Sequence, residues 1–134
     1  MVSSRTAKAR GTQAERDLIH KFWEAGWAAM RAAGSGSSQY PSPDIIAGKY
    51  GRQLAIECKL TAETKKYFPN EEIRLLNYFA KTFCSESWVA IKFPKKDWVF
   101  FNPEDLAVAG KNFSASVQLA DLKGLSFEEL VKMN

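Results

Sequence analysis

The 134 residues of this chain, of which 46% are hydrophobic, suit one domain with one core. No apolar run approaches the ~20 residues of a membrane helix, and the amino terminus lacks a signal-peptide core, so we expect a soluble, intracellular, cytoplasmic protein without membrane contact. Nineteen Lys and Arg against fifteen Asp and Glu give a net charge of +4, which is compatible with a polyanionic partner but does not establish one.

The amino-terminal part of the chain divides at Gly11. Residues 1–10 are basic and poor in apolar side chains, so we interpret them as a flexible arm before a single domain over 11–134. Thr12 and Glu15 have capping-box spacing, and the apolar stripe that follows predicts a helix ending near Gly26. "WAAMRAA" then predicts a short strand, and "GSGSSQYPSP" a loop.

The middle of the chain predicts a hairpin followed by a helix and two strands. "DIIAG" and "QLAIECKL" flank "KYGR", which is typical of two strands around a tight turn. "ETKKYFP" is expected to lie in a loop, "NEEIRLLNYFAKTFC" in a helix capped by Asn70, and "SWVAIKF" and "WVFF" in strands. This order predicts an α/β fold with a central mixed β-sheet flanked by helices.

The carboxyl-terminal part has weaker patterns. "NPEDLAV" indicates a helical turn and "KNFSASVQL" an extended segment. "SFEELVKM" predicts a short helix, with Ser126 as cap and Glu129 in the box position.

Two acidic residues occupy the otherwise apolar hairpin. If Lys49 pairs with Arg52, the same register places Asp44 opposite Glu57. Strand alternation puts Lys59 on the same face as Glu57. Facing carboxylates repel, and a hard divalent cation is the ordinary way to reconcile them. The alternatives are that Asp44 is a turn residue, and that Glu57 and Lys59 form a solvent-facing pair.

Glu15 has an unusual place on the predicted first helix. At 100° per residue it shares the apolar face with Leu18, Phe22 and Trp23. A carboxylate that faces the core needs a partner, so we expect Glu15 to reach toward the strand carboxylates. Closing the capping box with Thr12 is the simpler explanation, and the two roles are compatible.

These residues resemble a known nuclease motif. Pro43-Asp44, twelve residues, and then Glu57-Cys58-Lys59 match the PD-(D/E)xK pattern, whose members share a restriction-endonuclease-like core. With the flanking "GTQAERDLIHKFWEAGW", "RAAGSGSSQYPSPDIIAG" and "LAIECK", the chain is similar to the archaeal-type Holliday junction resolvases from about Gly11 to Phe101.

The resemblance implies a homodimeric, Mg²⁺-dependent endonuclease that nicks two strands of a four-way DNA junction symmetrically. Mn²⁺ should be able to replace Mg²⁺, and no nucleotide cofactor is expected. The implied catalytic residues are Glu15, Ser35, Asp44, Glu57 and Lys59, and the implied metal ligands are Glu15, Asp44, Glu57 and the main-chain carbonyl of Cys58.

The expected DNA contacts come from two sources. The resemblance implies that Arg16 and Arg31 contact DNA. The residues themselves add further candidates for phosphate contacts, namely basic side chains and a serine of the Gly and Ser loop. The alternative for the basic side chains is a solvated surface, and the alternative for the loop is a flexible linker. These candidates are Arg10, Ser37, Lys65, Lys66, Lys95 and Lys96.

Two functional alternatives stay open at this point. Another PD-(D/E)xK repair or restriction-like endonuclease would share the catalytic residues but cut linear duplex. A non-catalytic junction-binding protein would bind without metal-stimulated nicking.

Four aromatic residues are candidates either for a dimer interface or for the core, namely Phe79, Phe83, Trp88 and Trp98.

Overall fold

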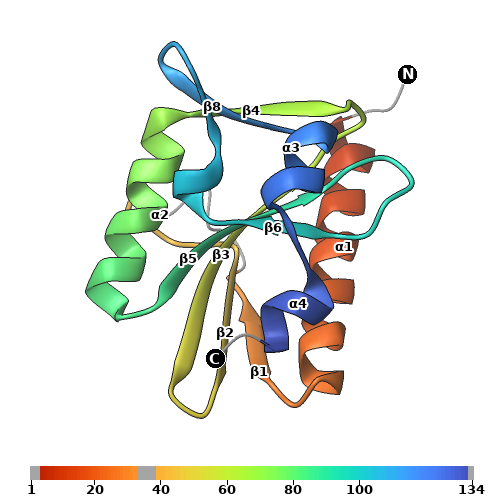
Figure 1. The fold of residues 1–134 in the computed structure, drawn as a ribbon. Coiled ribbons are helices and arrows are strands. Elements are labelled where there is room, and N and C mark those ends of the chain that lie inside the picture. The colour runs from red at the N-terminus through yellow and green to blue at the C-terminus, as the bar shows by residue number, and fades with distance from the viewer. Residues whose placement is uncertain (1–3, 33–38, 133–134) are drawn as a thin grey trace.

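A six-stranded mixed sheet forms the centre of the fold in the computed structural model, which describes residues 4–32 and 39–132 (Figure 1). All neighbouring strands are antiparallel except β3 and β5, which are parallel. The predicted fold class is confirmed. The strand order is β1 (Ala28–Arg31), β2 (Ile45–Lys49), β3 (Arg52–Leu60), β5 (Glu86–Lys92), β6 (Val99–Phe101) and β9 (Leu125–Ser126).

Helices cover both faces of this sheet, and each face has its own core (Figure 1). On one face, α1 (Ser4–Glu24) and α4 (Phe127–Lys132) pack on Leu54 and Ile56 of β3. On the other, α2 (Asn70–Phe83) packs over Ala55. The predicted alternation of β3 therefore divides its side chains between two cores, where a single core was expected, because helices cover both faces of the sheet.

The turn between β2 and β3 sets the register of the hairpin. Tyr50 and Gly51 have φ angles of 46° and 87°, and two central residues with positive φ form the turn that matches strand twist. Lys49 pairs with Arg52 and Ile45 with Ile56, so the predicted register is confirmed.

Local signals misplaced two helix starts. The first helix begins at Ser4 rather than at Thr12, so residues 4–10, interpreted as part of a flexible arm, are helical. Residues 1–3 lie outside the described residues. Asn70 is the first residue of α2 rather than its cap, because Pro69 takes the cap position and no side-chain bond caps the helix.

A second, three-stranded sheet was predicted only in part, because the extended segment expected in "KNFSASVQL" supplies one of its strands and the other two were not expected. The predicted loop around "ETKKYFP" contains β4 (Lys65–Pro69), which pairs with β8 (Asn112–Ser116), and β8 pairs with β7 (Ala107–Ala109). Val117–Lys123, expected to be extended in part, is helix α3, whose Ser116 cap accepts a hydrogen bond from Leu119.

Two carboxyl-terminal predictions are confirmed. Pro103–Asp105 is a short 3₁₀ turn, η2. At α4, the backbone N–H of Ser126 donates to Glu129 at 2.9 Å and that of Glu129 donates to the Ser126 hydroxyl at 3.1 Å, which is a complete capping box.

Candidate active site

The candidate site lies where β3 extends beyond β2. The pairing with β2 stops at Ile45 and Ile56, whereas β3 continues to Leu60 alongside β5. From Glu57 onward, one side of β3 is therefore not covered by a neighbouring strand. Asp44, the residue just before β2, lies at this opening.

Asp44 makes hydrogen bonds with the backbone of β3 where β2 no longer pairs with it. Its backbone N–H donates to the Ile56 carbonyl at 3.0 Å, and its Oδ2 accepts a hydrogen bond from the Cys58 N–H at 2.8 Å. Both backbone groups of a strand residue point toward the same side. The Cys58 carbonyl therefore faces the same opening as the Asp44 carboxylate.

Glu57 and Lys59 point to the α2 side of β3 and share the opening. The Lys59 Nζ lies 3.6 Å from Glu57 Oε2 and 2.9 Å from Oε1 of Glu72, in the first turn of α2. A hollow of about 350 Å³ is lined by Asp44, Glu57 and Glu72, together with Tyr40, Pro41 and Leu75.

The carboxylates strongly perturb one another. Burial, and then the negative charge of Asp44, raise the pKa of Glu57 to about 8. Burial also raises the pKa of the Cys58 thiol, and the charges of Asp44 and Glu15 add to this effect. Cys58 is therefore an unreactive core thiol, and the raised pKa of Glu57 favours its protonated form near neutral pH.

Lys59 is positively charged at neutral pH in this setting. Burial opposes its charge, but the hydrogen bond to Glu72 and the charges of Glu57, Glu72 and Asp44 outweigh burial and raise the pKa of Lys59. A lysine with a raised pKa is a hydrogen-bond donor and a counter-charge at neutral pH, and a poor base.

Glu15 meets an arginine near the strand acids. It is on α1, and the Arg31 Nε donates to Glu15 Oε1 at 2.9 Å, with the two side chains 24% (Arg31) and 18% (Glu15) exposed. Burial and the charge of Asp44 raise the pKa of Glu15, against the opposing effect of Arg31. Thr12 contributes only a long contact, 3.4 Å from Arg31 Nη2.

An oxygen-only donor set fits a hard divalent cation here. Asp44, Glu57 and the Cys58 carbonyl face one opening, and carboxylate and carbonyl oxygens are the ligands that Mg²⁺ and Ca²⁺ take. Within residues 4–32 and 39–132, no group of three or more His, Cys, Asp or Glu side chains is placed to hold a metal ion. Glu15 is near enough to feel the charge of Asp44, but it does not join Asp44 and Glu57 in a group of three metal-binding side chains.

Comparison with known proteins identifies the family. The family model described as archaeal Holliday junction resolvase (Hjc) matches residues 6–134. The crossover junction endodeoxyribonuclease Hjc of Archaeoglobus fulgidus is 41% identical over 91% of this chain and 95% of its own length. The chain belongs to the archaeal Holliday junction resolvase family.

Other family members give the same result. The crossover junction endodeoxyribonuclease Hjc of Methanocaldococcus jannaschii is 36% identical over 78% of this chain and 74% of its own length. The solved structure of Archaeoglobus fulgidus Hjc, a Holliday junction resolvase, matches with a TM-score of 0.84 at 41% identity, covering 90% of this chain and 99% of that chain. The family recognised from the motif and its flanks is confirmed.

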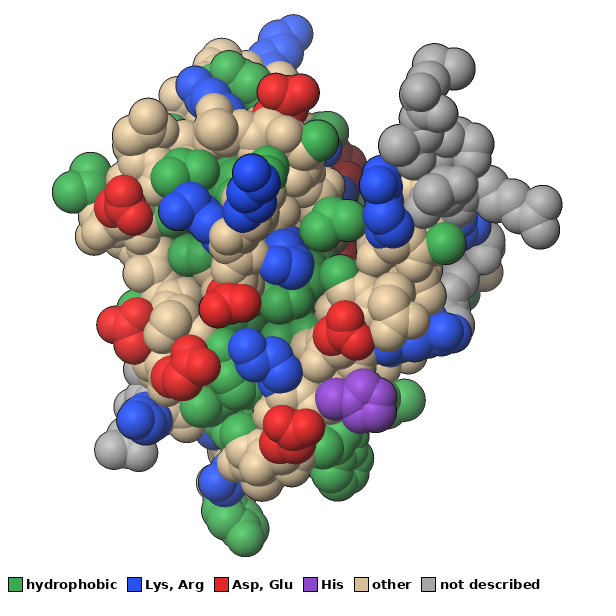
Figure 2. Space-filling model, turned by 90° about the vertical axis from the view of Figure 1, so that its right-hand side faces the viewer, with side chains coloured by type: hydrophobic (Ala, Val, Ile, Leu, Met, Phe, Trp, Pro, Cys, Tyr) green, Lys and Arg blue, Asp and Glu red, His purple; other side chains and the backbone are tan. Residues whose placement is uncertain are grey.

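The basic residues predicted to contact DNA are dispersed over this member of the family. Arg10 and Arg16 are exposed on α1, Lys65 and the half-buried Lys66 are on β4, and Lys95 and Lys96 are exposed between β5 and β6. Figure 2 shows that Lys and Arg alternate with Asp and Glu on the face that carries α1. Ser35 and Ser37, predicted for catalysis and DNA contact, lie outside the described residues.

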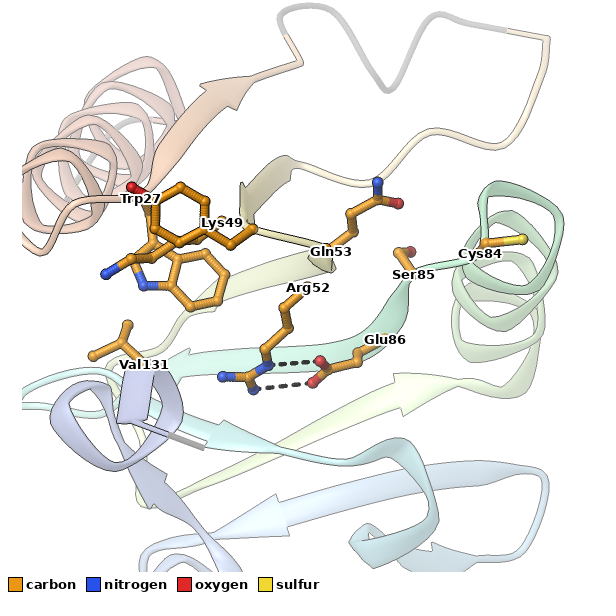
Figure 3. Close-up of a pocket in the computed structure, with 10 residues that line it drawn as sticks. Trp27, Lys49, Arg52, Gln53, Cys84, Ser85, Glu86 and Val131 are labelled. Atoms are coloured by element: carbon orange, nitrogen blue, oxygen red, sulfur yellow. Dashed lines mark hydrogen bonds and ion pairs between the residues drawn. The ribbon is translucent and has the colours of Figure 1, made fainter. Parts of the chain in front are cut away.

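A second hollow, of about 740 Å³, lies at the Arg52 end of β3 and is lined by Arg52 and Glu86 among others (Figure 3). Arg52 and Glu86 face one another there with hydrogen bonds of 2.7 and 3.0 Å, and Arg52 Nη1 donates to the Leu130 carbonyl at 2.6 Å. Trp88 also donates to Glu86, at 2.9 Å. These charges are already satisfied, and they tie α4 to the sheet.

Glu72 is the site residue that sequence reasoning missed. Its only local signal is an acidic residue in the first turn of a helix, which usually reflects the helix dipole.

Trp88 and Trp98, proposed for core or interface, are 2% and 6% exposed and belong to the core. None of the described helices is long and apolar enough to cross a membrane.

Proposed function

We propose that this protein acts inside the cell on four-way DNA junctions and nicks two opposed strands by metal-dependent phosphodiester hydrolysis. The observation that carries the proposal is the meeting of Asp44, Glu57 and the Lys59 ammonium at the open end of β3. Membership of the resolvase family supports the junction as substrate.

Mg²⁺, replaceable by Mn²⁺, is the proposed cofactor. Asp44, Glu57 and the Cys58 carbonyl would hold it, since Mg²⁺ prefers oxygen ligands and retains several waters. Such an ion supplies a more acidic water and polarises the phosphate. Because Arg31 holds the Glu15 carboxylate at 2.9 Å, we assign Glu15 to the edge of the ligand set and not to the residues that would bind the ion directly.

The protein's own groups supply charge and orientation. The Lys59 ammonium is placed to donate to a phosphate oxygen or to the attacking water, and to offset the negative charge that develops on the phosphate. The raised pKa of Lys59 favours this role over that of a general base. Glu15 and Arg31 form a second charged pair, on the α1 side.

Paired cutting requires two sites, so we propose a homodimer with a two-fold axis. A groove of about 350 Å³ lies along the edge strand β1 and is almost wholly apolar. Trp23, Met30 and Phe83 contribute to it and are 58%, 66% and 44% exposed, which is unusual for large apolar side chains on a small monomer. This groove is the proposed dimer contact.

The test compares a four-way junction with a linear duplex of the same arm sequence, in Mg²⁺ and in EDTA. We expect paired nicks on the junction alone, no nicks in EDTA, and loss of cutting with retained binding in Asp44→Asn. The exposed Asp121→Asn, which removes the same charge from α3, should cut normally.

The same assay separates the alternatives. Cutting of the linear duplex at defined sequences would indicate a restriction-like or repair endonuclease. Binding without Mg²⁺-stimulated nicks would indicate a non-catalytic junction-binding protein. Full cutting by Asp44→Asn would contradict the role of that residue.

A further inference from the structure

The Lys59 ammonium is bound more closely by a residue outside the motif than by the motif's own acid. Glu72 Oε1 accepts a hydrogen bond from Lys59 Nζ at 2.9 Å, whereas Glu57 Oε2 is 3.6 Å from the same nitrogen. A separation of 3.6 Å is too long for a hydrogen bond. Glu72 therefore sets the position of the ammonium.

The helix dipole does not explain this contact. Two acids lie in the first turn of α2, Glu71 and Glu72, and both favour the helix in the same way. Glu71 pairs with Arg74 at 2.6 Å, and their side chains are 62% and 64% exposed. Glu72 is 36% exposed, borders the hollow shared with Asp44 and Glu57, and reaches a lysine thirteen residues away in the sequence.

We propose that Glu72 is a positioning residue for Lys59, which rests on the proposed function of the site. A lysine side chain has a flexible four-carbon stem, and without Glu72 its ammonium would move to the Glu57 carboxyl group, whose ionised form it favours. That contact would occupy the oxygens that a divalent cation needs. The hydrogen bond to Glu72 keeps the ammonium beside Glu57 and leaves the Glu57 oxygens accessible.

The kinetic test uses a matched set of substitutions: Glu72→Ala, Glu72→Gln, Glu71→Ala and Glu71→Gln. Glu72→Ala should lower kcat for junction nicking by about 10- to 100-fold while KM stays within about twofold, since the loss is one of orientation. Glu72→Gln should fall between wild type and Glu72→Ala, because its amide oxygen still accepts from Lys59. Both Glu71 variants should cut like wild type.

A second measurement needs neither DNA nor metal. In EDTA, the rate at which an acylating reagent modifies Lys59, followed by mass spectrometry, should rise severalfold in Glu72→Ala, because the ammonium loses its partner. It should not change in Glu71→Ala. Equal thermal unfolding midpoints of Glu72→Ala and Glu71→Ala would exclude a general loss of structure as the cause.

The outcomes distinguish the two proposals. If wild type binds junctions but does not nick them, the proposed function fails, and the role of Glu72 fails with it. If wild type nicks and Glu72→Ala matches Glu71→Ala in kcat, only the role of Glu72 is overturned. Unchanged modification of Lys59 in Glu72→Ala would show that the contact does not hold the amine, and would also overturn that role.

Discussion

Glu57→Gln should change how the stability of the metal-free protein depends on pH. Burial and the charge of Asp44 raise the pKa of Glu57 from 4.5 to about 8 in the folded state. The folded protein therefore prefers the protonated acid. The whole of this stabilising contribution is present at pH values below the pKa of Glu57 in the unfolded state, near 4.5. The contribution is lost as the pH rises through about 8.

The size of the effect follows from the shift. One pKa unit corresponds to about 1.4 kcal/mol, so the full shift sets an upper limit of roughly 5 kcal/mol on the stability lost. Water penetration and the neighbouring Lys59 reduce it, and we expect wild type to lose about 2–3 kcal/mol through Glu57 between pH 5 and 9. The amide introduced by Glu57→Gln carries no charge at either pH, so the variant should keep this part of the stability.

Urea unfolding in EDTA at pH 5, 7 and 9 measures this difference. Glu63→Gln, which changes an exposed acid between β3 and β4, is the control and should follow wild type. Mg²⁺ added at pH 9 should restore stability to wild type by RT ln(1 + [Mg²⁺]/Kd), and should restore much less to Glu57→Gln. Equal losses from pH 5 to 9 in wild type and Glu57→Gln would refute the reasoning.

Three further outcomes are expected. Arg52→Ala should lower the free energy of unfolding by about 2–3 kcal/mol in denaturant titrations, because Glu86 keeps only its hydrogen bond from Trp88 and the Leu130 carbonyl loses its guanidinium donor. An unchanged midpoint would count against this. Gly124→Ala should cost about 1–3 kcal/mol, since its methyl would overlap Val99 and lie 2.8 Å from the Ala120 carbonyl, and adding Val99→Ala should recover only part of the loss. The log Kd for junction binding should rise linearly with the log of the salt concentration, with a slope of about 0.9 for each phosphate contact. A slope of zero would exclude binding dominated by phosphate contacts.

Short-range patterns determined the parts of this protein that depend on neighbouring residues. The alternation of "QLAIECKL" and the two-residue turn at Tyr50 and Gly51 were enough to predict the hairpin register, and with it the approach of Asp44 to Glu57. The capping box of Ser126 and Glu129 formed as predicted, because its donors and acceptors lie within one helical turn. The family followed from the spacing of Asp44, Glu57 and Lys59 and from the segments that flank them.

Contacts between residues far apart in the chain were decided by the tertiary structure alone. A capping signal at Thr12 could not stop α1, which continues back to Ser4. The basic segment at Lys65 becomes a strand only because β8, some fifty residues later, offers it a partner. No pattern along the chain reveals which acid will hold a given cation. The pairing of Lys59 with Glu72, and of Arg31 with Glu15, depends on how helices pack against the sheet, because that packing sets which charges are close enough to interact.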